Sequence, residues 1–139
     1  MERTVSIVKP DGVLRGLTGE IIRRFEDSGM RVVAVKMMKL TREEARSFYV
    51  EHEGQPFYQR LTEFMSSGPV VAMVLEAEGA VQKNRDLMGA TDYREAAPGT
   101  IRYDFARDVT KNIIHGSDCE VSAAREIPLL FNASEIFSD

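Results

Sequence analysis

The stretch that most constrains the fold of this chain is the apolar run VVAMVL at residues 70–75, which Gly68 and Pro69 introduce. A strand with one face in water alternates apolar and polar residues, whereas this run is apolar at every position. It therefore predicts a central strand that is buried on both faces of its sheet. Such a strand needs helices packed against its sheet, so we expect an α/β architecture.

The other segments carry strand and helix signals in alternation. The sequence Thr41-Arg42-Glu43-Glu44 is a capping box that starts a helix. Residues 90–111 show no strong period, and long irregular loops in compact domains are usually functional. In chain order we predict strand 4–8, a turn at 9–12, helix 18–28 capped by Thr18, strand 31–40, two helices within 42–65, strand 70–75, helix 80–88, the loop, a helical stretch 122–126 and strand 127–131.

This order predicts an α/β fold of the α+β sandwich type. Its simplest match is a ferredoxin-like βαββαβ core, in which helices cover a four-stranded antiparallel sheet. Pro128 places the last strand at an edge or at its start. A length of 139 residues suits one domain, so we expect residues 1–139 to form a single domain.

The bulk composition excludes several classes of protein. A net charge of -4 offers no basic field to a nucleic acid, so we expect no specific nucleic-acid partner. Cys119 is the only cysteine, which rules out an internal disulfide and suits a reducing compartment. The sequence shows no signal-peptide pattern and no apolar stretch of membrane-spanning length. We therefore expect a cytoplasmic protein without a membrane partner.

Several common catalytic devices are missing from the sequence. It contains no G-x-x-x-x-G-K-[ST], no G-x-G-x-x-G and no G-x-S-x-G. One cysteine and two histidines without a local spacing do not suggest a zinc site. Cations and hydrogen-bond donors remain at the ends of the predicted elements, and together they suffice to hold the phosphates of a nucleotide. They are Lys9, Arg85, Thr91, Arg102 and Asn112.

The irregular loop leads into the segment NIIHGSD at residues 112–118. Two isoleucines anchor it, Gly116 lets the backbone turn, and Ser117 and Asp118 can start a helix. A lone histidine is more often structural than catalytic. The surrounding cations are what favour a functional role for His115.

At these residues the chain resembles a nucleoside diphosphate kinase. The similarity runs from residue 2 to about residue 131, and the histidine segment is its strongest signature. The matching pieces are Glu2-Arg3-Thr4, Lys9-Pro10-Asp11-Gly12, Phe25, Pro56-Phe57, Ser67-Gly68-Pro69-Val70-Val71, Met88-Gly89-Ala90-Thr91, Pro98-Gly99-Thr100-Ile101-Arg102 and residues 112–118.

The resemblance implies a ping-pong kinase that maintains nucleotide pools. The family moves the γ-phosphate of a nucleoside triphosphate to a nucleoside diphosphate through a phosphohistidine, which here is His115. Glu126 would orient the imidazole, with support from Ser117 and Tyr49. The phosphates and sugar would bind Lys9, Arg85, Thr91, Arg102 and Asn112, with clearance at Gly116.

The resemblance also implies a base site, a metal and an assembly. Phe57 and Val109 would sandwich the base beside Leu61, without reading its edges. Mg²⁺ would arrive on the phosphates of ATP and other nucleotides, so no metal site on the protein is expected. The family forms tetramers or hexamers from a common dimer, and we expect a homo-oligomer.

Some residues depart from the family or carry no expected role. Gln55 and Tyr58 flank Phe57 where the family often has arginine and phenylalanine, and Asp92-Tyr93 replaces a common Asn-Pro. We interpret His52 as a surface-helix residue and Asp118 as an N-cap, and Cys119 receives no role.

Two other functions stay open on the sequence. A relative could keep the nucleotide pocket and act as a binding or scaffolding protein, or it could serve in assembly only. Loss of turnover with retained nucleotide affinity in His115→Ala would favour the enzyme.

Overall fold

The strand predicted from the apolar run is β3 (Val70–Ala77), which is buried along its whole length. The computed structural model describes residues 1–138. Successive side chains of β3 enter two different hydrophobic cores, because neighbours in a strand point to opposite faces. Val70, Ala72 and Val74 face one core, and Val71, Met73 and Leu75 face the other. The prediction of a strand buried on both faces is confirmed.

The sheet has four strands in the order β2-β3-β1-β4. The other three are β1 (Glu2–Val8), β2 (Arg31–Met38) and β4 (Ile114–Gly116). Every neighbouring pair is antiparallel. This is the ferredoxin-like arrangement that the order of elements predicted.

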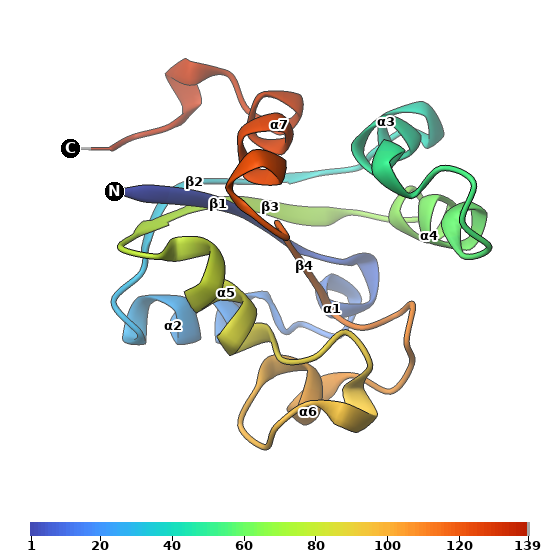
Figure 1. The fold of residues 1–139 in the computed structure, drawn as a ribbon, viewed down its shortest axis with the longest axis horizontal. Helices are drawn as coiled ribbons and strands as arrows, with labels where there is room; N and C mark the ends of the chain where they lie inside the picture. Colours follow the sequence, from blue (N-terminus) through green and yellow to red (C-terminus); the bar gives the residue numbers. More distant parts are fainter. Residues whose placement is uncertain (139) are drawn as a thin grey trace.

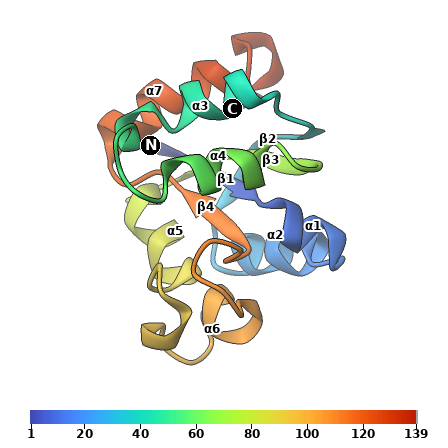
Figure 2. The ribbon, with the colours of Figure 1, turned by 90° about the vertical axis from the view of Figure 1, so that its right-hand side faces the viewer.

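Helices cover both faces of this sheet (Figure 1). Figure 2 shows α3 and α7 lying together over one face, with α2 and α5 on the other side of the strands. The upper layer holds α3 (Arg42–Phe48), η1 (Val50–His52), α4 (Tyr58–Met65) and α7 (Glu120–Leu130), while α1 (Pro10–Leu14), α2 (Thr18–Asp27), α5 (Ala80–Met88) and α6 (Ile101–Phe105) lie on the other side. Two short 3₁₀ turns complete the elements, η2 (Tyr93–Glu95) and η3 (Ala133–Glu135). None of the helices within residues 1–138 is long and apolar enough to cross a bilayer.

The predicted last strand, residues 127–131, is wrong. These residues continue α7 to Leu130, and Pro128 lies inside the helix. Ala123, Ile127 and Leu130 recur at helical spacing and pack towards the sheet, and this burial outweighs the hydrogen bond that the proline cannot make. The fourth strand is instead β4, which carries the histidine segment.

Several element ends also differ from the predictions. The expected turn at residues 9–12 begins α1, since Pro10 suits the first position of a helix. The cap of α2 is Leu17 rather than Thr18. The irregular stretch 90–111 contains α6, whose N-cap Thr100 accepts a hydrogen bond from Tyr103 N. The capping box at Thr41 is confirmed.

Candidate active site

A cavity of about 750 Å³ opens at the end of the sheet where β1 runs into α1. Its wall brings together residues that are far apart in the sequence, from α4, α5, the loop before α6 and β4. It contains all the predicted site residues except Glu126 and Ser117, which lie behind the histidine. The predicted residues in the wall are Lys9, Tyr49, Phe57, Leu61, Arg85, Thr91, Arg102, Val109, Asn112, His115 and Gly116.

His115 is fixed from its buried side. It lies on β4 opposite Ile7 of β1, and its side chain is only 15% exposed. Its Nε2 lies 3.1 Å from Oε1 of Glu126, a buried carboxylate. An ionised carboxylate can only accept, so Nε2 carries the hydrogen and Nδ1 keeps the lone pair. In this tautomer the lone pair of Nδ1 is not used by the contact with Glu126.

Ser117 connects this carboxylate to the sheet. Its hydroxyl donates to Glu126 Oε1 at 2.9 Å and accepts from the backbone N–H of Val5 at 3.2 Å. Its own backbone N–H donates to Val5 O at 3.1 Å. Glu126 is therefore held by two donors, one of them anchored to β1.

Two aromatic rings pack edge-on against the imidazole. The ring centroid of His115 lies 5.1 Å from that of Phe48 and 5.4 Å from that of Tyr49. Burial, and next the Glu126 carboxylate, raise the pKa of Tyr49, so its phenol stays protonated at neutral pH. The Tyr49 hydroxyl makes no hydrogen bond to any side chain or backbone group of residues 1–138, although Tyr49 lines the cavity.

Asp11 holds the backbone that presents the histidine, a role that the sequence did not predict. Ile113 has a φ of 76°, a left-handed conformation that is strained for a β-branched residue. Its N–H donates to Asp11 Oδ2 at 3.1 Å, and its carbonyl accepts from Lys9 N at 2.8 Å. A Cβ at Gly12 would lie 2.8 Å from Val8 Cγ1, so only glycine fits there. The segment that joins β1 to α1 therefore holds Ile113, two residues before His115.

Gly116 is required by packing on α5. A Cβ at this position would lie 2.5 Å from Asn84 Nδ2 and 2.7 Å from Met88 Sδ. The glycine thus lets β4 approach α5 closely, in addition to any clearance for a phosphate. Sequence reasoning did not show this helix contact.

Two buried cations face the cavity and are held by neutral oxygens. Lys9 Nζ donates to Asn112 Oδ1 at 2.7 Å, and Arg102 donates to Gly89 O at 3.0 Å and to Ile114 O at 2.6 Å. Burial, and next the charge of Arg102, lower the pKa of Lys9 from 10.5 to about 7. Burial, followed by Arg85, lowers the pKa of Arg102 to about 10. The site therefore concentrates positive charge where an anion can bind.

Asn112 connects the cations to the long loop. Its Nδ2 donates to Thr91 O at 3.2 Å and to Val109 O at 3.1 Å, which places both of these predicted contacts at the cavity. Arg85, by contrast, is exposed and forms an ion pair with Asp118 at 2.9 Å. Asp118 therefore does not cap α7 as predicted, because Cys119 is the N-cap.

Apolar residues line the outer part of the cavity. Phe57 and Val109 are 43% and 44% exposed, while Leu61 is buried beside them. His52 lies on a helix, η1, as expected, but it is half-buried and lines this cavity, which the sequence did not predict. Its ring stacks on Tyr49 at 6.2 Å and lies 5.4 Å from Phe57. Its spacing of three residues from Tyr49 was the available signal, since it places both rings on one side of a helical turn.

The sequence of this chain is similar to those of known proteins along nearly its whole length. The profile of the nucleoside diphosphate kinase family matches residues 2–136. Nucleoside diphosphate kinases of Desulforapulum autotrophicum and Desulfosudis oleivorans are 55% and 57% identical over 136 residues, which cover 98% of this chain and 99% and 98% of theirs.

Solved structures agree with these sequence matches. The nucleoside diphosphate kinase of Aquifex aeolicus has a TM-score of 0.95 at 48% identity and covers 97% of this chain and 98% of its own. That of Halobacterium salinarum, in complex with CDP, has a TM-score of 0.96 at 49% identity, over 99% of this chain and 91% of its own.

The fold and the site thus define an enzyme of the phosphotransferase class. The chain belongs to the nucleoside diphosphate kinase family, as its motifs predicted.

Proposed function

We propose that this protein transfers the terminal phosphate of a nucleoside triphosphate to a nucleoside diphosphate through a phosphohistidine at His115. The observation that carries the proposal is the asymmetry of the imidazole. Nε2 is held by Glu126 at 3.1 Å, and the ring lines a cavity whose buried charged groups are Lys9 and Arg102. A fixed nucleophile beside concentrated cations is the arrangement that phosphoryl transfer needs.

In the first half-reaction, Nδ1 of His115 attacks the γ-phosphorus of the bound triphosphate. The bond between this phosphorus and the bridging oxygen breaks, and the nucleoside diphosphate leaves with that electron pair. The imidazole becomes positively charged, and Nε2–H donates to the Glu126 carboxylate, which stabilises this charge. A second nucleoside diphosphate reverses these steps and removes the phosphate from Nδ1.

The cations of the cavity stabilise the charge of the transferred group. Lys9 and Arg102 are already held by backbone and amide oxygens, so they need little rearrangement when phosphate arrives. Arg85, Thr91 and Asn112 complete the phosphate and sugar contacts that we assign. The protonated hydroxyl of Tyr49 is placed to donate to an oxygen beside the histidine.

The base lies between Phe57 and Val109, next to Leu61. Stacking and apolar contact use the face of a base, which all nucleobases share, so we propose broad acceptance of purines and pyrimidines. The CDP complex of the Halobacterium salinarum relative supports this choice of ligand class.

Mg²⁺ fits this site as a companion of the nucleotide. The cavity wall offers cations, hydroxyls and amides, and its carboxylates are only Asp86 and Asp118. Within residues 1–138, no group of three His, Cys, Asp or Glu side chains could hold a metal ion. When bound to the phosphates, Mg²⁺ would neutralise their charge.

We further propose a homo-oligomer that works in the cytoplasm on nucleotide pools. β2 is an edge strand, and Val35 and Met37 on it are 51% and 63% exposed, which supports self-association. The free, exposed Cys119 is compatible with a reducing compartment. Light scattering after size-exclusion chromatography would test the assembly, and a monomer would contradict it.

Labelling the phosphoenzyme tests the central proposal. With γ-labelled ATP and no acceptor, we expect an acid-labile, base-stable label on His115, which GDP then removes. His115→Ala should lose the label and at least about 10³-fold of the turnover, while it keeps its affinity for ADP. An unlabelled wild-type protein that still binds ADP would favour the binding or scaffolding function.

A further inference from the structure

The carboxyl end of α3 is held by side chains from two neighbouring helices. Tyr58 of α4 donates its hydroxyl hydrogen to Arg46 O at 2.9 Å. Arg125 of α7 donates to Phe48 O at 2.8 Å and to Ser47 O at 3.4 Å. The last carbonyls of a helix have no partner further along it, so external donors are effective here.

Each of these two donors is adjacent in sequence to a residue of the proposed active site. Arg125 precedes Glu126, which orients His115, and the two side chains approach to 3.9 Å. Tyr58 follows Phe57, which is the N-cap of α4 and the proposed base platform. The end of α3 is thus a common attachment point for the helix behind the phosphate carrier and for the helix that begins at the base platform.

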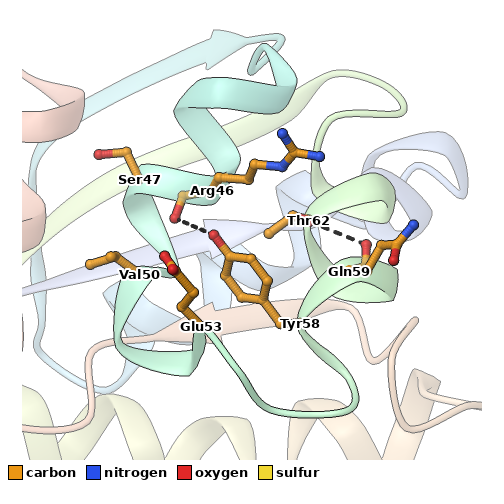
Figure 3. Close-up of a pocket in the computed structure, with 7 residues that line it drawn as sticks. All are labelled: Arg46, Ser47, Val50, Glu53, Tyr58, Gln59 and Thr62. Carbon is orange, nitrogen blue, oxygen red and sulfur yellow. Dashed lines mark hydrogen bonds between the residues drawn. The ribbon is translucent and has the colours of Figure 1, made fainter.

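The Tyr58 bond crosses a groove at the surface between α3 and α4. This groove has a volume of about 560 Å³, and the Tyr58 ring lines it with its hydroxyl directed at Arg46 O (Figure 3). The ion pair between Arg42 and Glu63, at 3.7 Å, is half-exposed and adds little to the link between these helices.

We propose that Tyr58 is a positioning residue for the nucleoside base, which sets the distance between Phe57 and His115 through the carboxyl end of α3. This inference rests on the proposed function, because it assigns the base to Phe57. The hydrogen bond from Tyr58 to Arg46 O links the proposed base site to the proposed phosphate site through the end of α3.

Tyr58→Phe removes only the hydroxyl and is the decisive variant. Loss of one hydrogen bond that holds the platform should weaken ADP binding and raise the KM for ATP by about three- to tenfold, with kcat unchanged. Phosphoramidate, a small phosphoryl donor without a base, should phosphorylate His115 at the wild-type rate. Tyr103→Phe, which removes a hydroxyl from a half-exposed ring on α6, is the matched control and should leave both donors unaffected.

Arg125→Met provides a second variant with a different expected pattern. Arg125 holds α3 and also lies near Glu126, so its loss should reduce phosphorylation by ATP and by phosphoramidate alike. Circular dichroism and thermal unfolding would show that each variant is folded.

Three results would contradict the positioning role of Tyr58. They are an unchanged ADP affinity in Tyr58→Phe, an equal loss with both donors in that variant, and a change in kcat without a change in KM. Failure of the proposed function looks different, because the wild type would then show no label on His115 with either donor. Calorimetric titration with ADP still compares wild type and Tyr58→Phe in that event.

Discussion

The two sides of the His115 ring differ in how their polar groups are satisfied. On the buried side, Glu126 and Ser117 complete a set of hydrogen bonds that ends on the backbone of β1. On the open side, Lys9 and Arg102 are held by neutral oxygens, and burial, followed by a neighbouring cation, lowers the pKa of each.

The groups that orient the imidazole are therefore separate from the groups that carry positive charge into the cavity. The buried side has both an acid and its donors within the protein, so it fixes the imidazole without any ligand. The open side gathers positive charge that burial makes costly, and an anionic ligand relieves this cost. Changes on the buried side should therefore affect the chemical step, and changes on the open side should affect nucleotide binding as well.

Arg102→Met is expected to have the largest effect. It removes a buried charge at the proposed phosphate site together with the donors to Gly89 O and Ile114 O. We expect kcat/KM for ATP to fall by about 10³-fold and ADP affinity to fall with it. Arg102→Lys restores the charge but not the planar fork, so it should recover only part of the loss. An unchanged ADP affinity in the methionine variant would contradict a phosphate role.

Glu126→Gln should have a smaller effect, confined to the buried side. The amide keeps the shape of the side chain but cannot stabilise a positive imidazole as a carboxylate does. We expect a loss of about 10²-fold in the rate of His115 phosphorylation, with ADP affinity unchanged. Single-turnover labelling measures the rate, and calorimetry measures the affinity. Equal losses of rate and affinity would show that the two sides are not separable.

Lys9 should make nucleotide binding depend on pH. Its pKa of about 7 means that most ligand-free molecules hold a neutral lysine at pH 8. Bound phosphates favour the charged form of Lys9. The protein should therefore take up about one proton when ADP binds at pH 8, and ADP should bind less tightly as the pH rises. Calorimetry in buffers of different ionisation enthalpy counts this proton, and Lys9→Arg should show no uptake.

The sign of the accompanying stability effect follows from the same shift. The folded pKa of Lys9 lies below its ordinary value of 10.5, so the unfolded chain binds more protons between pH 7 and 10.5. The ligand-free protein therefore gains stability from this group as the pH rises through that range. ADP should reduce this gain, which thermal unfolding at several pH values can measure.

The fold could be predicted where one pattern dominated. The unbroken apolar run of β3 and the capping box at Thr41 each have a single reading. The pattern of residues 127–131 allows two interpretations, because Ile127, Leu129 and Leu130 suit either a buried strand or the end of a helix. β4 has only three residues, and its pairing with β1 is a long-range contact that local patterns do not contain.

The sequence predicted which residues form the site better than it predicted the contacts that hold them in place. The family resemblance supplied the cations and the histidine, and the structure places them around one cavity. The clamp on Ile113 by Asp11 was missed because a positive φ at isoleucine has no sequence signal. The hydrogen bond from Arg125 to Phe48 O at the end of α3 was missed for a similar reason, since the two residues lie 77 positions apart.

The smallest expected effect concerns Asp118, one of the two carboxylates in the wall of the open side. It pairs with Arg85 at 2.9 Å, and both side chains are exposed, at 64% and 44%. A nucleotide must compete with this pair for Arg85, but an exposed ion pair contributes less than about 1 kcal/mol. Asp118→Asn should therefore tighten ADP binding by at most about fivefold at low salt, and the difference should shrink at high ionic strength because salt screens exposed charges. Weaker binding in this variant would mean that Asp118 holds Arg85 in its binding position, and the open side would then contain an orienting carboxylate like the buried side.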